Sequence, residues 1–148
     1  MKIFSILAGL FLLLICSVPA TVTAKESATT LHIGKPVMCL TLSRIDETII
    51  LDDQTILIKM IGNALYLNRL PQPCYGLKTG DGFGYDTSID KLCKQDIITV
   101  LSSASVVGNH CGLGEFYPLF HDGTTRQAVK ALRNGGLEKL VKENAFSE

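Results

Sequence analysis

Hydrophobic and polar positions alternate in short runs between residues 37 and 118, which is the pattern of β-strands with one buried face. In residues 37–44 (VMCLTLSR), for example, Met38, Leu40 and Leu42 alternate with smaller or more polar neighbours. Comparable runs follow at 48–52 (TIILD), 54–60 (QTILIKM), 64–70 (ALYLNRL), 82–87 (GFGYDT), 96–103 (DIITVLSS) and 114–119 (GEFYPL). About six or seven short strands of this kind predict a mainly-β domain, a small antiparallel sandwich or a barrel-like structure.

Turn-forming residues separate these runs and indicate where strands end. Residues 61–63 (IGN) offer a glycine-containing hairpin connection between two of the runs. Pro71 and Pro73 are expected to take the chain out of the sheet, because proline cannot donate a hydrogen bond to a strand ladder. For the same reason we expect Pro118 to end the last strand, so the β domain is predicted to span residues 37–118.

The pattern becomes helical in the C-terminal tail, residues 119–148. Residues 122–136 (DGTTRQAVKALRNGG) have a capping-type start, apolar residues at helical spacing, and two glycines that stop the helix. Residues 137–146 (LEKLVKENAF) continue with a second amphipathic run. We expect this tail to cover an open edge of the sheet, and docking on another molecule is the alternative.

The N-terminal segment, residues 1–24, has the three parts of a cleavable signal peptide. Lys2 supplies the positive charge, residues 3–16 are apolar, and small-residue cleavage signals end at Ala20 and Ala24. The apolar run is shorter than the roughly 20 residues of a membrane span. The mature protein is therefore predicted to reside in the periplasm or outside the cell, without a stable membrane span.

Two other interpretations of this segment are weaker. Cys16 suggests a lipoprotein, but Ile15 stands where a lipidated cysteine needs a small residue. An uncleaved anchor helix fits the three-part pattern less well. Residues 25–36 (KESATTLHIGKP) are polar and contain glycine and proline, so they are predicted to form a mobile leader before the β domain.

Loss of Cys16 with the signal peptide leaves an even set of cysteines in an oxidising compartment, which predicts two disulfides. The set is Cys39, Cys74, Cys93 and Cys111. Four cysteines allow three pairings. We favour the nested one, Cys74–Cys93 inside Cys39–Cys111, because the inner pair flanks a loop-rich stretch and the outer pair would join the first strand to the last.

Charge composition excludes one class of partner. The chain has 14 basic and 14 acidic residues, and no run of basic residues occurs. Nucleic-acid binding needs clustered lysine and arginine, so we predict no nucleic-acid partner.

The stretch NHCGLGEFYPLFHD, residues 109–122, raises the question of a thiol site or a metal site. His110 and Cys111 are adjacent, but neighbours in a strand point to opposite faces, and an even cysteine set favours a half-cystine over a nucleophile. No catalytic residue is therefore predicted. The groups that a metal site would use are His32, His110, Glu115, His121 and Asp122. Their spacing matches no zinc pattern, and no EF-hand register fits the acidic stretches 46–53 (DETIILDD) and 80–90 (GDGFGYDTSID), so neither metal ligands nor a cofactor are predicted.

Several short motifs together carry a resemblance to a known family. They are CL (39–40), ID…ILDDQTILIKM (45–60), LYLNRLP..C.GL (65–77), FGY (83–85), LC..D.I.VL (92–101) and CGLGEFYP (111–118). With these motifs the chain resembles a family of small secreted bacterial proteins, a domain of unknown function with four spaced cysteines. The resemblance covers residues 37–118 and implies an exported, disulfide-containing domain, but it supplies no activity and no binding residues. The helical tail, residues 119–148, departs from the family pattern.

Because no catalytic constellation is present, we expect an exported, non-catalytic binding or accessory domain, for which an envelope protein is one candidate partner. One alternative is a periplasmic enzyme whose acid/base site is assembled in space from Asp52, Asp53 or Glu115 with His110. The other is a carrier of a small ligand or metal that uses a barrel mouth.

Overall fold

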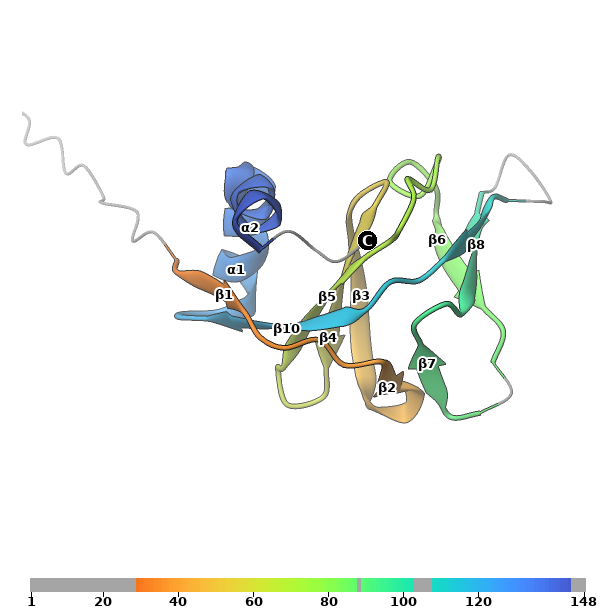
Figure 1. Ribbon diagram of the computed structural model, residues 1–148, viewed down its shortest axis with the longest axis horizontal. Helices are drawn as coiled ribbons and strands as arrows, with labels where there is room; N and C mark the ends of the chain where they lie inside the picture. Colours follow the sequence, from red (N-terminus) through yellow and green to blue (C-terminus); the bar gives the residue numbers. More distant parts are fainter. Residues whose placement is uncertain (1–28, 88, 103–107, 145–148) are drawn as a thin grey trace, which may run out of the picture.

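The computed structural model describes residues 29–87, 89–102 and 108–144, and within these ranges the chain is mainly β, as predicted (Figure 1). The described strands are β1 Leu31–Ile33, β2 Cys39–Thr41, β3 Ile45–Asp52, β4 Thr55–Met60, β5 Leu65–Arg69, β6 Gly82–Tyr85, β7 Lys91–Cys93, β8 Ile97–Leu101, β9 His110–Gly112 and β10 Phe116–His121. The helical segments are η1 Leu42–Arg44, α1 Thr125–Ala131, η2 Leu132–Gly136 and α2 Leu137–Asn144. The predicted signal peptide lies outside the described residues.

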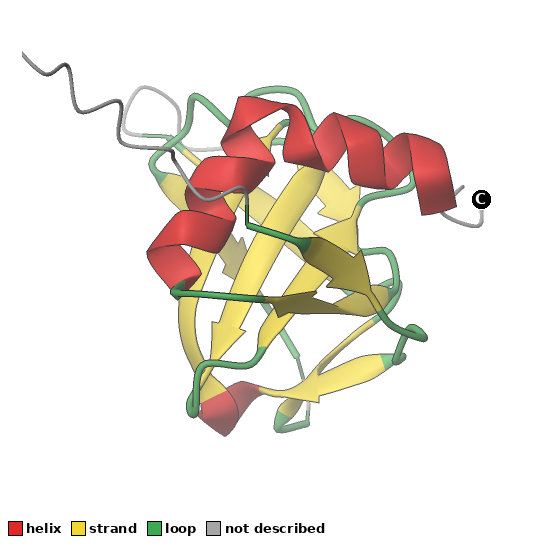
Figure 2. Ribbon diagram, turned by 90° about the vertical axis from the view of Figure 1, so that its left-hand side faces the viewer, coloured by secondary structure: helices red, strands yellow, loops and turns green. Residues whose placement is uncertain are grey.

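Within the described ranges the strands form three antiparallel sheets. The central sheet has the order β1-β10-β5-β4-β3, and the smaller sheets are β2-β7 and β6-β8-β9. The two smaller sheets pack on one face of the central sheet, and the helical tail lies across its other face (Figure 2). The molecule is therefore an antiparallel sandwich with an added helical layer.

The first core fills the space between the central sheet and the two smaller sheets. Ile56 and Ile58 of β4 contribute from the central sheet, and Leu92 of β7 and Ile98 of β8 contribute from the other layer. All four side chains are at most 1% exposed. Full burial of such a side chain stabilises by about 1.5–3 kcal/mol, so this cluster joins the two β layers.

The second core lies between the opposite face of the central sheet and the tail. Leu57 and Leu67 point to this face because they alternate with the residues of the first core. Ala128, Leu132 and Leu140 of the tail cover them. The prediction that the tail packs on the β domain is confirmed. The tail covers a whole face of the sheet, because that face carries leucine rows that need cover, and α2 also contacts the edge strand β1.

Local sequence explains how the tail begins and bends. The Thr124 side chain accepts a hydrogen bond from the Gln127 backbone, and the Gln127 side chain accepts one from the Thr124 backbone at 2.8 Å, which completes a capping box. Gly135 has a φ of 94°, a left-handed conformation that favours glycine. The predicted glycine stop is thus a kink, after which α2 continues in a new direction.

Part of the predicted mobile leader belongs to the sheet. Leu31–Ile33 form β1, which pairs with β10 through the register Leu31↔His121. The preceding residue, Thr30, donates its backbone N–H to the Asp122 carboxylate at 2.6 Å. The prediction is wrong for this segment because its alternating apolar residues pair with a strand about ninety positions away, which local polarity does not reveal.

Pro118 does not end the last strand, contrary to the prediction, and β10 continues to His121. Pro118 lies opposite Tyr66 of β5, and its carbonyl oxygen accepts a hydrogen bond from the Gly34 backbone at 2.8 Å. The nitrogen and carbonyl of one residue in an antiparallel strand point to the same side, so the proline nitrogen also faces Gly34. The missing donor therefore leaves the ladder to β5 intact.

The four cysteines form two disulfides, but the favoured pairing, Cys74–Cys93 with Cys39–Cys111, is wrong. The bonds are Cys39–Cys93 and Cys74–Cys111. Cys39 and Cys93 lie directly opposite each other in the β2–β7 ladder, with Cα atoms 4.0 Å apart. Strand register, which sequence spacing does not encode, decides the pairing. Two disulfides are compatible with an oxidising compartment.

Candidate functional site

The predicted choice of half-cystine over nucleophile for Cys111 agrees with its disulfide to Cys74. His110 is exposed at the start of β9, and its Nδ1 lies 2.9 Å from the Thr99 hydroxyl of the neighbouring strand. Because the Cys111 sulfur is bonded, the pair cannot supply a thiolate and its base.

Asp52 and Asp53 organise the tip of the β3–β4 hairpin. The Asp52 carboxylate accepts a hydrogen bond from the Gln54 backbone at 2.7 Å. Asp53 accepts two backbone donors from the loop after β5, Cys74 N at its carbonyl (2.6 Å) and Lys78 N at its carboxylate (2.8 Å). Asp52 therefore stabilises the hairpin turn itself, and Asp53 joins the hairpin tip to the following loop.

Glu115 is held by different partners. Its carboxylate accepts hydrogen bonds from Lys94 at 2.9 Å and from the Tyr117 hydroxyl at 3.2 Å. The Lys94 ammonium holds the pKa of the Glu115 carboxyl below its ordinary value of 4.5, and partial burial opposes that effect. In the described part of the chain, no hydrogen bond joins Glu115 or His110 to Asp52 or Asp53.

The candidate metal ligands are also dispersed. His32 and His121 lie on paired strands, but His32 is opposite Phe120. The Thr30 backbone N–H holds the pKa of the Asp122 carboxyl below its ordinary value of 3.8. No three histidine, cysteine, aspartate or glutamate side chains gather as a metal site within the described ranges.

Residues of the family-like motifs have structural roles at the junction of β5 and β10. The buried Asn68 side chain donates to the Gly114 carbonyl at 2.8 Å and accepts from the Gly114 backbone N–H at 3.1 Å. Gly114 lies so close to β5 that an added Cβ would overlap the Arg69 carbonyl oxygen. Asn68 and Arg69 of β5 and the CGLGEF motif, residues 111–116, therefore fix the start of β10 against β5.

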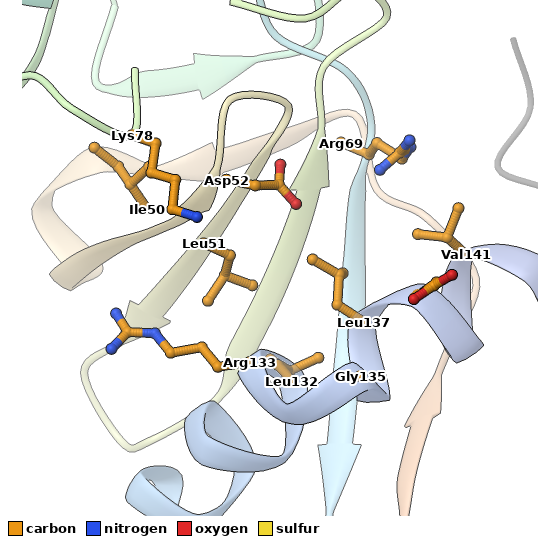
Figure 3. Close-up of a pocket in the computed structure, with 11 residues that line it drawn as sticks. Ile50, Leu51, Asp52, Arg69, Lys78, Leu132, Arg133, Gly135, Leu137 and Val141 are labelled. Carbon is orange, nitrogen blue, oxygen red and sulfur yellow. The ribbon is translucent and has the colours of Figure 1, made fainter. Parts of the chain in front are cut away.

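A cleft of about 730 Å³, here called the tail cleft, opens between the central sheet and the tail (Figure 3). Apolar side chains from β3, η2 and α2 contribute to its lining: Ile50, Leu51, Leu132, Leu137 and Val141. Leu51, Leu132 and Leu137 lie in the middle of the view in Figure 3, with charged side chains around them. The cleft therefore combines an apolar floor with a polar rim, as ligand pockets commonly do.

Three cations border the tail cleft, namely Arg69, Lys78 and Arg133. Arg69 donates to two neutral oxygens, Gln54 Oε1 at 3.1 Å and Thr55 Oγ1 at 3.4 Å. Among the described residues none of the three cations forms an ion pair, although two carboxylates, Asp52 and Glu138, also line the cleft. Their guanidinium and ammonium groups can therefore bind an anion.

A second cleft, of about 880 Å³, lies beyond Arg133 at the start of α1. Arg133 borders both clefts. The lining of the second cleft includes Ile49 and Val129, the cations Lys59 and Arg126, and His121, whose Nδ1 is buried with no hydrogen-bond partner in the described chain. Lys59 is bound to the Asp46 carboxylate, which raises the pKa of its ammonium above 10.5.

Sequence reasoning did not identify these cleft residues as a site. Lys78 and Arg133 belong to segments that are far apart in the chain, so only the fold brings them to one cleft. One local signal exists, because Arg126, Val129 and Arg133 follow one another at helical spacing and line the second cleft together.

The helices of the described ranges lack the length and apolar character that a membrane crossing requires. A comparison of the chain with models of protein families, with curated proteins and with solved structures finds no match. The family resemblance of residues 37–118 therefore stays a prediction.

Proposed function

We propose that this chain is an exported, non-catalytic binding domain, and that the tail cleft holds an anionic ligand with an apolar part. The two disulfides support residence in an oxidising compartment, the periplasm or the cell exterior. The N-terminal signal-peptide pattern supports the same location.

The observation that carries the proposal is the group of cations without ion partners beside an apolar floor. Arg133 and Lys78 are exposed, and each lacks a carboxylate partner in the described structure. An anionic group can bond to these donors while an apolar group covers Leu51 and Leu137. The dispersal of Glu115, His110 and the hairpin aspartates favours binding over acid/base catalysis.

The test is calorimetric titration of the purified mature protein with octanoate, with octylamine and octanol as ligands of matched chain length. We expect octanoate to bind more tightly than both, because only the carboxylate bonds to the cations. Arg133→Ala is expected to weaken octanoate binding by about tenfold. Lys139→Ala is the matched control, because Lys139 is 75% exposed on the same tail and borders neither cleft. Equal affinity for the three ligands, or equal effects of the two variants, would contradict the proposal.

A further inference from the structure

Strand β3 is an exposed, long edge of the central sheet. It has eight residues, and the described chain pairs it with β4 alone. Outside that ladder, residues 46–51 form no backbone hydrogen bond with other described residues. The side of β3 that faces away from β4 therefore presents backbone donors and acceptors that another strand can use.

The two clefts follow this edge. From β3, alternate residues Glu47 and Ile49 line the second cleft, and Leu51 lines the tail cleft. From the tail, Arg126 and Arg133 line the second cleft, and Arg133 also borders the tail cleft. The two clefts, whose linings share Arg133, are here together called the β3 groove, with β3 on one side and the cations of the tail on the other.

We propose that an extended, acidic segment of a partner protein adds to β3 as a further strand and occupies the β3 groove. This inference rests on the proposed function, because it identifies the proposed anionic ligand as an acidic peptide segment. Backbone hydrogen bonds to β3 hold the segment, and its carboxylates face Arg126 and Arg133. Alternate residues of an extended chain face the same side, so acidic residues at alternate positions present their carboxylates together to the arginine side of the groove.

The acidic residues of β3 limit where the acidic residues of the partner segment can lie. Glu47 and Asp52 stand towards the two ends of the strand, and Asp46 is bound to Lys59. Carboxylates of the partner segment are therefore expected near the middle of the groove, beside Arg133.

The register of β3 sets how much of the edge can pair. The β3–β4 ladder is regular from Glu47 to Ile50 and has irregularities on both sides of that stretch. Irregularities of this kind normally protect a sheet edge from pairing. The partner segment therefore pairs with the four central residues and leaves the ends of β3 free. The opposite edge of the same sheet, β1, offers three residues.

The test uses a fluorescent octapeptide of alternating glutamate and valine, titrated against the purified mature protein by fluorescence anisotropy. Three further peptides complete the set: two have N-methyl groups on alternate backbone nitrogens, one peptide for each alternation, and the third has lysine in place of glutamate. N-methylation on the pairing edge removes donors that strand addition requires, so we expect it to weaken binding by at least about tenfold. The lysine peptide is expected to bind more weakly by a similar factor, because its charge opposes the arginines.

Protein variants locate the site on the same peptide. Arg133→Glu and Arg126→Glu are each expected to weaken binding about tenfold, whereas Lys139→Glu is expected to change it less than twofold. Unchanged binding of both N-methylated peptides overturns strand addition. If octanoate still binds in an Arg133-dependent way, the proposed function survives that result. If neither octanoate nor the unmodified peptide binds the native protein, both proposals are overturned.

Discussion

The two faces of the central sheet are covered in different ways. On one face, β2, β7 and the β6–β8–β9 sheet carry or adjoin both disulfides. On the central sheet, Asn68 of β5 is fully buried and bonded to the Gly114 backbone. On the other face, the tail is held by side-chain packing, and Arg133 and Lys78 have no ion partner within the described ranges.

The two faces therefore differ in what holds their covering layers. The disulfide-bonded side is fixed by covalent bonds. The tail side retains cations around apolar side chains, and no disulfide among the described residues fixes the tail to the sheet. The proposed binding surface lies on the side that is held by side-chain packing.

Removal of a disulfide is expected to have the largest effect on stability. In the double variant Cys74→Ala and Cys111→Ala, we expect a loss of about 4 kcal/mol in the free energy of unfolding, because the bridge closes a long loop. Urea unfolding measures the loss, and amide hydrogen exchange reports where it falls. The tail amides are expected to keep their protection relative to the rest of the chain. A preferential loss of protection in α1 and α2 would show that the stability of the tail depends on the disulfide-bonded layer.

The matching change on the other face is Leu132→Ala. Leu132 is 1% exposed in the second core, so the cavity left by truncation is expected to cost about 2–5 kcal/mol. Limited proteolysis should show cleavage in the tail before cleavage in the sheets. Lys139→Ala serves as the control on the same tail, and equal protease resistance of the two variants would count against a tail held by packing.

A smaller effect is expected at the start of the tail. Thr124→Ala removes the side-chain acceptor of the capping box, which is worth about 1 kcal/mol in typical helices. Thr124→Ser retains the hydroxyl and should restore most of the loss. Both are measured by urea unfolding, and equal destabilisation by alanine and serine would mean that the hydroxyl does not cap α1.

The smallest expected effect is on pH dependence. The pKa of the Glu115 carboxyl is lowered in the folded state, mainly by the hydrogen bond from Lys94. Its stabilising contribution is therefore present above the ordinary pKa of 4.5 and is lost as the pH falls through the lower, folded-state pKa. We expect Glu115→Gln to cost less than about 1 kcal/mol at pH 7 and to approach the native protein at pH 3. A difference in unfolding free energy between the variant and the native protein that grows as the pH falls would contradict this prediction.

Local patterns predicted the parts of the fold that depend on neighbouring residues. The hairpins β3–β4 and β4–β5 follow from alternation in TIILD, QTILIKM and ALYLNRL, and the glycine at 135 marks the predicted break in the tail, although this break is a kink between two helical segments. The errors concern contacts between distant segments. The strand at Leu31–Ile33, the continuation of β10 through Pro118 and the disulfide pairing all depend on which strand lies beside which.

The candidate site belongs to the same class of distant contacts. Lys78 follows β5, Arg133 follows α1, and Leu51 belongs to β3, so their proximity is a property of the topology. Of the histidines and acids that the sequence made conspicuous, Asp52 lines the tail cleft and His121 lines the second cleft. The others are dispersed or used in structural hydrogen bonds. Conspicuous residue types were therefore a poor guide, whereas cations without internal partners became informative once the fold was known.

The two glycines of the CGLGEF motif differ in how much variation they should allow. A Cβ at Gly112 would meet open space, whereas one at Gly114 would overlap the Arg69 carbonyl oxygen of β5. In a library of random single substitutions selected for secretion, position 112 should accept several residue types, and position 114 should accept glycine alone. The motif would then have one tolerant and one invariant glycine, and only the second would serve as a diagnostic feature in the search for distant relatives.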